Sequence, residues 1–408
     1  MKRFLHAHAT HPDWRMALAL AASQLQTQQE AQESPCTPTF GWLYLTDHYA
    51  NDAEALLAEV RRHWPGVTFI GAVGVGISAS GVEHFDEPAL ALMLCDLSPD
   101  HFRVFSGARP LAGLAVGFEP ATAQLHADPS TSDLAELIAE MAERTSSGYV
   151  FGGLASARNR TLHIADGVFE GGLSGAAFTR EVALVSRVTQ GCQPVGPVRR
   201  ITGAERNVIT TLDDEPALDC VLRDLGMLPN EPRRALPALR QTLVGLSESH
   251  ADVLERSGQF GCDTLVRHLI GIDPQRGGIA IGDVAVPGMQ LAFCQRNTEA
   301  ARRDLVRICA EIREELEPET LPLAQALALA RGGVDAPAAA AACQRIAGAV
   351  YVSCAGRGGP HFGAPSAELA IVRQALGDVP LVGFFAAGEV AHHHLYGYTG
   401  VLTAFAAD

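Results

Sequence analysis

The sequence predicts a mixed α/β (α+β) protein in which helices cover mixed β-sheets in two related lobes. One unit occurs twice: residues 43–76 and residues 350–388 both read as strand, polar loop, amphipathic helix, strand and glycine-bounded loop. Gly71 and Gly76 have the same spacing as Gly383 and Gly388. Each half also contains a meander of short strands joined by Gly, Pro and Asp turns. This combination is typical of mixed sheets rather than of a purely parallel sheet or an all-β sandwich.

The first half is predicted to begin with a short strand at Phe4 and Leu5 and a helix over residues 14–29. Residues 40–45 and 67–73 read as apolar strands on either side of a second helix, which ends at Pro65–Gly66. The remaining elements are strands at 90–95 and 102–105, a helix around Leu134–Met141, and strands in the segments YVFGG, TLHIAD, GAAF and VALVSRV.

The second half opens with a change of character at residues 213–240. This segment contains several prolines, leucines at helical spacing and no strand pattern, which predicts a helical linker. We therefore expect two domains, at residues 1–225 and 226–408. Short strands follow in TLVGLSES, HLIGID, GIAIGD and MQLAFC, then a helix over 298–314, an Ala-rich stretch at 323–346 and the second copy of the repeat.

The composition limits the classes of partner. The chain has 408 residues, a net charge of −15 and no basic cluster beyond short pairs of arginines, so it lacks the cationic patch that binds nucleic acid or an anionic membrane. Its nine cysteines are scattered and include no CxxC pair, which is typical of reduced thiols in a cytoplasmic protein. No apolar run approaches the roughly 20 residues that span a bilayer. We expect a cytoplasmic protein.

The string SCAGRG at residues 353–358 follows the apolar strand of the second copy, where α/β sheets place ligand contacts. Arg357 offers a forked donor for a carboxylate, and Cys354 is a candidate nucleophile or a small buried filler. Neither residue has an equivalent in the TDHYAN stretch of the first copy. Residues found in one copy only are candidates for function rather than for fold.

The segment GEVAHHHLYGYTG at residues 388–400 follows the second strand of that copy. Glu389 takes the place that Ile77 has in the first copy. The histidines at 392–394 make His392 and His394 candidate metal ligands, but consecutive residues of an extended chain point to opposite sides, so an exposed loop is the alternative. No cofactor is expected: the glycine loops lead into strands and not into the helix that a dinucleotide fingerprint requires.

The strings SCAGRG, GFFAAGE and LYGYTGVLTAF closely resemble the C-terminal signature of FIST (F-box and intracellular signal transduction) proteins. FIGAVGVGISASG followed by YVFGGLAS resembles the glycine turns of the FIST N-terminal domain. The resemblance covers almost the whole chain. The first glycine loop, GAVGVGI, lacks the Cys/Thr and Gly-Glu residues that the family often has there, and the triple histidine is a second departure.

This resemblance implies a sensory module that binds small molecules such as amino acids. In that family the domain is sometimes fused to kinase, chemoreceptor or cyclic-nucleotide output domains, and in eukaryotes to an F-box, whereas we expect no room for an output domain in this sequence. The resemblance therefore implies a stand-alone, bacterial-type sensor that acts on a separate signalling protein.

The leading functional hypothesis is binding of an amino acid or a similar zwitterion in the second copy. Arg357 would bind the carboxylate and Glu389 the ammonium group. The predicted ligand-binding residues are Ser353, Cys354, Arg357, Phe384, Gly388, Glu389 and Tyr398, with Phe384, Phe385 and Tyr398 as an apolar wall. The alternative for the two charged residues is a structural ion pair with each other.

Two other hypotheses remain open. Cys354 could act as the nucleophile of an enzyme, with His361 or one of His392–His394 as its base. The sequence contains no GxSxG, P-loop or HExxH motif, which favours a protein that is not an enzyme. The third hypothesis is a protein-interaction scaffold without a ligand.

Overall fold

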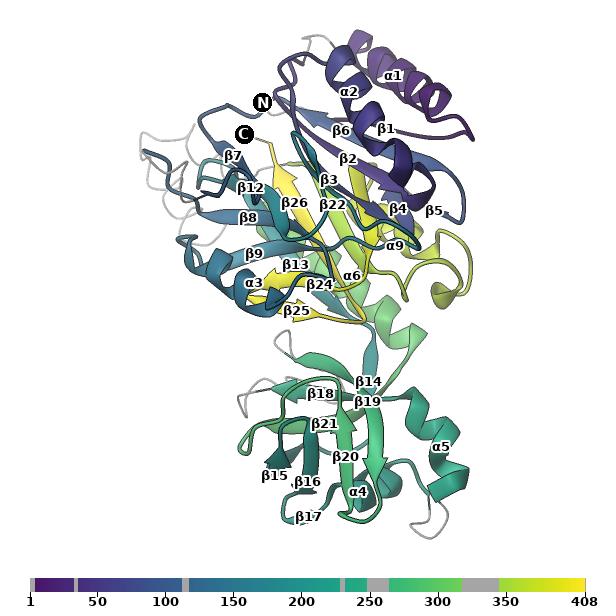
Figure 1. The fold of residues 1–408 in the computed structure, drawn as a ribbon. Helices are drawn as coiled ribbons and strands as arrows, with labels where there is room; N and C mark the ends of the chain where they lie inside the picture. The colour runs from purple at the N-terminus through teal and green to yellow at the C-terminus, as the bar shows by residue number, and fades with distance from the viewer. Residues whose placement is uncertain are drawn as a thin grey trace, which may run out of the picture. The chain divides into compact units, whose positions relative to one another are not determined.

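The computed structural model describes residues 4–32, 36–111, 117–227, 232–247, 264–317 and 345–407. The Ala-rich stretch at 323–344, Cys262 and Cys343 lie outside the described residues. The chain forms two compact units (Figure 1). We call residues 1–188, 305–395 and 399–408 the core unit, and residues 189–304 with 396–398 the inserted unit.

The core unit contains three six-stranded sheets. The first has the order β1 (Phe4–Thr10), β6 (Ala89–Cys95), β2 (Phe40–Thr46), β3 (Thr68–Gly74), β10 (His163–Ala165), β11 (Val168–Phe169). The second has the order β7 (Phe102–Phe105), β12 (Leu173–Phe178), β8 (Thr122–Ala127), β9 (Tyr149–Leu154), β24 (Glu389–His392), β25 (His394–Tyr396). The third has the order β13 (Leu184–Gln190), β26 (Thr399–Ala406), β22 (Ile346–Cys354), β23 (Leu381–Ala386), β4 (Gly76–Ala79), β5 (Val82–Phe85).

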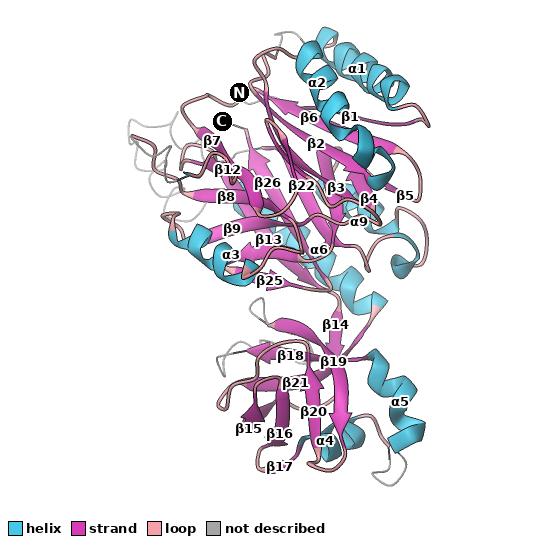
Figure 2. Cartoon of the chain, viewed as in Figure 1, coloured by secondary structure: helices cyan, strands magenta, loops and turns pink. Residues whose placement is uncertain are grey.

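Helices cover these sheets, as the mixed α+β prediction required (Figure 2). The apolar faces of α1 (Trp14–Glu30) and α2 (Ala53–His63) pack with the first sheet in one hydrophobic cluster. Further helices among the described residues are α3 (Leu134–Glu143), α9 (Ala367–Leu376) and the 3₁₀ turns η1 (Asp47–Asp52) and η3 (Gly359–Phe362). The helix α6 (Thr298–Leu316) begins in the inserted unit and ends in the core unit. The predicted fold class is confirmed.

Each sheet is centred on one strand–helix–strand unit with parallel strands. The two copies seen in the sequence form β2–α2–β3 and β22–α9–β23. A third unit, β8–α3–β9, has the same form, although the sequence analysis recognised only its separate helix and strand. The repeat is therefore threefold, and all three units lie in the core unit.

One glycine in the second strand of each unit explains the shared glycine spacing. Gly71 lies opposite Leu43, Gly152 opposite Leu125, and Gly383 opposite Tyr351. A Cβ atom at these glycines would lie 1.8, 1.9 and 1.8 Å from the carbonyl oxygen of the opposite residue. No side chain fits there, so these glycines belong to the fold.

The three units exchange β-hairpins in a cycle. The hairpin β4–β5 follows β3 in the chain but pairs with β23. The hairpin β10–β11 follows β9 and pairs with β3, and the strand β24 follows β23 and pairs with β9. The carboxyl ends of the three second strands meet as a result: Ser156 N donates to Val73 O (3.1 Å), and Leu154 N donates to Gly388 O (2.8 Å).

The inserted unit is a small closed sheet. Its strands are β14 (Cys192–Pro194), β15 (Arg199–Glu205), β16 (Val208–Leu212), β17 (Glu215–Pro216), β18 (Thr242–Ser247), β19 (Leu265–Asp273), β20 (Gly278–Ile281) and β21 (Gln290–Arg296). The pairing runs β21–β15–β16–β20–β19–β18 and returns to β21. The predicted helices of segment 213–240 form α4 (Ala217–Asp224) and α5 (Pro232–Gln241), and their Leu218 and Leu239 belong to the hydrophobic core of this unit.

We expect Gly383→Ala to lower the free energy of unfolding by about 3 kcal/mol or more, because the new methyl group overlaps backbone and not a movable side chain. Urea denaturation of the full chain measures this. The control is Gly107→Ala, where nothing lies within 4 Å of the added Cβ. Equal stability of the two variants would contradict the packing role of Gly383.

Candidate functional site

The candidate site lies at the carboxyl ends of β22 and β23. Cys354 ends β22 beside Ala386, the last residue of β23. A turn follows in which Arg357 N donates to Cys354 O (2.7 Å), and Ala355 N donates to Ala386 O (2.8 Å). This end of a parallel strand pair is where α/β proteins usually bind ligands.

Arg357 is held by a protein carboxylate. Its side chain is 1% exposed, and Nε donates to Glu368 Oε1 at 2.9 Å, with Nη2 2.8 Å from the same oxygen. Glu368 also accepts hydrogen bonds from Tyr351 Oη (2.6 Å) and Ser353 Oγ (3.0 Å). The Glu368 carboxylate thus binds Arg357 together with Tyr351 and Ser353 of β22. These hydrogen bonds fix the turn after Cys354.

Glu368, the partner of Arg357, was not among the site residues predicted from the sequence. It lies in the first turn of α9, in phase with Val372 and Leu376 on the buried face of the helix. A glutamate at an apolar helical position is the signal that could have identified it, since a buried carboxylate requires a partner.

Glu389, the first residue of β24, is fully buried. Its Oε2 accepts hydrogen bonds from Thr399 Oγ1 (2.7 Å) and Thr399 N (3.1 Å). Burial raises the pKa of Glu389 to about 8, against the opposing effects of the Thr399 hydrogen bonds, the positive charge of Arg357 and a hydrogen bond with the Cys354 side chain. Most of this carboxyl group is therefore protonated at neutral pH.

Cys354 is half-buried and its side chain contacts the Glu389 carboxyl group. Gly356 and Ala387 on the neighbouring turns are exposed, whereas the other cysteines of the described part of the chain are buried. The structure thus brings together Ser353, Cys354, Arg357 and Glu389, with Cys354 nearest to solvent. Their part in ligand binding stays a prediction.

The first copy of the repeat also contributes to this site, through the exchanged hairpin β4–β5. Glu83 of β5 accepts a hydrogen bond at Oε2 from Gly359 N (2.8 Å), and Glu83 N donates to Ser366 Oγ (3.0 Å). Burial raises the pKa of Glu83. Sequence reasoning did not find this residue, because its contact depends on the hairpin exchange.

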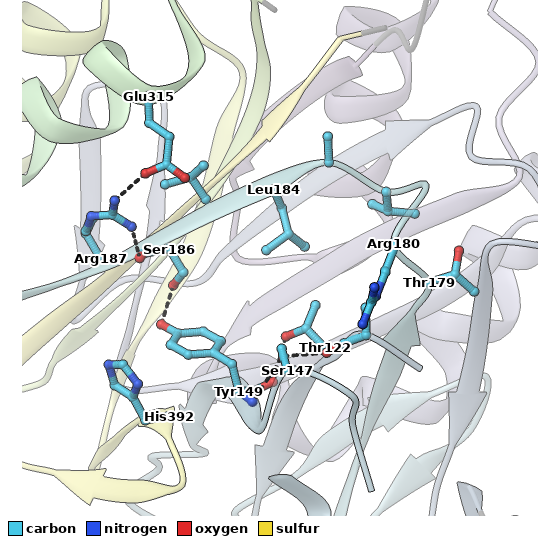
Figure 3. A pocket seen from close by; sticks show the side chains of 14 residues that line it. Thr122, Ser147, Tyr149, Thr179, Arg180, Leu184, Ser186, Arg187, Glu315 and His392 are labelled. Atoms are coloured by element: carbon cyan, nitrogen blue, oxygen red, sulfur yellow. Dashed lines mark hydrogen bonds and ion pairs between the residues drawn. The ribbon is translucent and has the colours of Figure 1, made fainter. Parts of the chain in front are cut away.

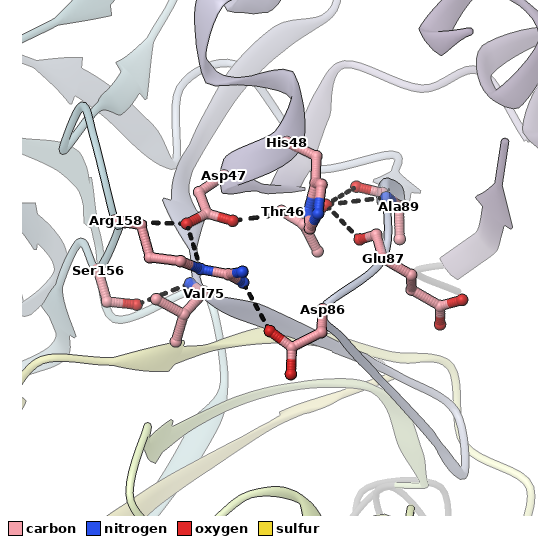
Figure 4. A network of polar contacts seen from close by, with 9 residues as sticks. All are labelled: Thr46, Asp47, His48, Val75, Asp86, Glu87, Ala89, Ser156 and Arg158. Carbon is pink, nitrogen blue, oxygen red and sulfur yellow. Dashed lines mark hydrogen bonds and ion pairs between the residues drawn. The ribbon is translucent and has the colours of Figure 1, made fainter. Parts of the chain in front are cut away.

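The equivalent end of the first copy is closed by its own polar contacts (Figure 4). Thr46 occupies the position of Cys354, three residues after the residue opposite the glycine, and its Oγ1 accepts from Ala89 N (2.8 Å). Asp47 accepts from Arg158 N (2.9 Å) and pairs with Arg158 Nε (3.1 Å), while Arg158 Nη2 lies 3.0 Å from Asp86 Oδ1.

The equivalent end of the third unit is closed as well. Asp128 stands at the position of Cys354, and its Oδ1 accepts from Ser130 N (2.8 Å) and Ser130 Oγ (2.7 Å). Its Oδ2 accepts from Gly171 N (2.9 Å). Of the three equivalent strand ends, the one at Cys354 alone places a half-buried thiol beside a buried, protonated acid.

Other predicted site residues lie elsewhere. Phe384 is fully buried and its ring stacks on Tyr44 with the centroids 5.3 Å apart, so it packs in the core. Gly388 is buried and its carbonyl accepts from Leu154 N. Tyr398 belongs to the inserted unit, where its ring lies 5.4 Å from the guanidinium carbon of Arg296. Their parts in ligand binding stay predictions.

The histidines are dispersed over different elements. His361 lies in η3, His392 ends β24 with its ring 4.7 Å from that of Tyr149, and His394 begins β25. Within the described ranges, no group of three or more His, Cys, Asp and Glu side chains is arranged to hold a metal ion.

The fold and this site define a mixed α+β protein with a threefold strand–helix–strand repeat. In one of the three units, a half-buried cysteine and a buried acid lie at the strand ends. Comparison of the sequence with protein families assigns it: the FIST N domain matches residues 39–215 and the FIST C domain matches residues 217–392. The chain belongs to the FIST family, whose domains are generally sensory domains of signal transduction. The predicted division at residues 1–225 and 226–408 stays a prediction.

Relatives of similar length occur in mycobacteria. The chain is 30% identical over 418 residues to the uncharacterized protein MT0656 of Mycobacterium tuberculosis (strain CDC 1551 / Oshkosh), an alignment that covers 97% of this chain and 98% of the relative. It is 29% identical over 417 residues to the uncharacterized protein Mb0898c of Mycobacterium bovis, covering 98% and 97%. None of the described helices is long and apolar enough to cross a membrane.

We expect Glu389 to make the stability of the protein depend on pH. Its pKa is about 8 in the fold and 4.5 in the reference state, so its stabilising effect is complete below pH 4.5 and is lost as the pH rises through 8. The free energy of unfolding should fall by roughly 3 kcal/mol between pH 5 and pH 8 from this group.

Denaturation of Glu389→Gln across this pH range measures the effect, because the neutral amide removes the titration. The exposed Glu136→Gln serves as control and should retain the wild-type slope. An unchanged slope in Glu389→Gln would show that Glu389 is not the titrating group.

Proposed function

We propose that this protein is a cytoplasmic sensor that binds a small molecule at the carboxyl ends of β22 and β23 and acts on a separate signalling protein. One observation carries the proposal: a half-buried Cys354 beside the buried acid Glu389, at a strand end whose two counterparts are closed by Arg158 and by Ser130 with Gly171. A sensory role agrees with the FIST family.

An amino acid or similar zwitterion is the ligand class that we propose. Its ammonium group would bind Glu389, which loses its proton when a cation arrives, since a nearby positive charge lowers the pKa of a carboxyl group. Its carboxylate would share the guanidinium group of Arg357 with Glu368, because a guanidinium group keeps its charge and matches a carboxylate in shape.

A panel of amino acids and organic acids tests this ligand class. A ligand that binds the folded state alone raises the melting temperature by mass action. We expect a shift with at least one amino acid, and calorimetry at pH 7 in buffers of different ionisation enthalpy should then detect release of about one proton from Glu389.

Glu389→Gln should abolish the proton release and weaken binding. Asp86→Asn, at the matching end of the first copy, should leave both unchanged. A complete panel without a thermal shift would contradict the zwitterion and favour a scaffold without a ligand.

A second candidate function is a cysteine-dependent reaction, favoured by the hydrogen bond between the side chains of Cys354 and Glu389. The ionised fraction of Glu389 could take the thiol proton, and the resulting thiolate would be the nucleophile. This places a carboxyl group, and not one of the predicted histidines, in the role of the base.

Labelling with a maleimide probe, followed by mass spectrometry of the peptides, tests the reaction hypothesis. If Glu389 activates Cys354, the thiol should react at pH 7 faster in the folded than in the denatured protein, and Glu389→Gln should slow it. A folded rate equal to or below the denatured rate would exclude an activated nucleophile at this position.

A further inference from the structure

The core unit contains a ligand-sized cavity apart from the site at Cys354 (Figure 3). Its volume is about 460 Å³, within the range of small-molecule pockets. It lies between the edge strand β13 and the amino-terminal ends of β8 and β9. The lining residues that determine its chemistry are Tyr149, Arg180, Val182, Leu184, Arg187 and His392.

The walls of the cavity consist mostly of apolar side chains and of polar side chains that hydrogen-bond to other protein groups. Val182 and Leu184 line one side, and the rings of Tyr149 and His392 meet edge to face on another, with the ring planes at 75°. Tyr149 Oη donates to Ser186 Oγ (2.8 Å), which in turn lies 2.8 Å from Thr403 Oγ1. These hydroxyl groups hydrogen-bond to one another, so this wall presents aromatic surface to an occupant.

The two arginines of the cavity differ in their charge partners. Arg187 forms an ion pair with Glu315, and its Nε lies 3.4 Å from Glu311 Oε2. Its Nη1 also donates a hydrogen bond to Ser186 O (2.9 Å). Arg180 is exposed and donates a long hydrogen bond from Nη2 to Ser146 Oγ at 3.4 Å. Its charge interacts with that of the adjacent Glu181, but it forms no ion pair within 4 Å in the part of the chain that the structure describes. In Figure 3 it lies at the opposite end of the cavity from the Arg187–Glu315 pair.

We propose that this cavity binds a small monocarboxylate with an apolar body. The carboxylate pairs with the guanidinium group of Arg180, which matches a carboxylate in shape and charge. The apolar body lies against Leu184 and Val182 and across the Tyr149–His392 rings. The site is independent of the proposed zwitterion site, although the four-residue strand β24 connects them, with Glu389 at its start and His392 at its end.

Calorimetric titration with octanoate tests the site, with 1-octanol as the probe that lacks the carboxylate. We expect saturable octanoate binding by the full chain, weakened about tenfold in Arg180→Gln because one charge-assisted contact is lost. Octanol binding should be the same in both proteins. Leu184→Trp fills the cavity and should abolish binding of both probes.

Two controls separate this site from other effects. Arg62→Gln, an exposed arginine on α2, should bind octanoate as the wild type does. Glu389→Gln should also bind octanoate normally, so that failure of the zwitterion site and failure of this cavity give different results. Absence of saturable octanoate binding, or wild-type affinity in Arg180→Gln, would overturn the proposal.

Discussion

The cyclic exchange of hairpins among three sheets is the constraint on which the core unit depends. The segment that follows the second strand of each strand–helix–strand unit pairs with the sheet of another unit. The equivalent segment of a different unit pairs with its own sheet in turn. None of the three sheets is complete without chain from a second unit. Within each unit, the two parallel strands approach so closely that only glycine fits at Gly71, Gly152 and Gly383.

The same exchange builds the candidate site. Glu389 starts the segment that leaves β23 for β9, so its carboxyl group lies fully buried where the sheets meet, and burial keeps it protonated. Glu83 lies on the hairpin that follows the first copy, and its carboxylate accepts a hydrogen bond from Gly359 N. The first copy thus stabilises the site of the second through a backbone contact, while its own strand end is closed by the Asp47–Arg158 pair.

Comparison of the two sequence copies predicted the candidate site, because residues that differ between equivalent frameworks are candidates for function. It identified Cys354, Arg357 and Glu389, which the structure places together. It assigned Arg357 an open carboxylate-binding role or a pair with Glu389, whereas the structure supplies Glu368 from α9. Helical periodicity shows that Glu368 faces inward, but it does not identify the residue that Glu368 contacts.

The sequence by itself determined the fold class, the strand–helix–strand copies and the family, because hydrophobic periodicity and glycine spacing are local properties of the chain. The tertiary structure decided that the repeat is threefold, that hairpins pass between sheets, and that the carboxylates of Glu83, Glu368 and Glu389 surround one turn of chain. These features join residues far apart in the sequence, such as Glu83 and Gly359, which are 276 positions apart. Their contacts arise from the order of strands within sheets, and no local pattern in the sequence specifies that order.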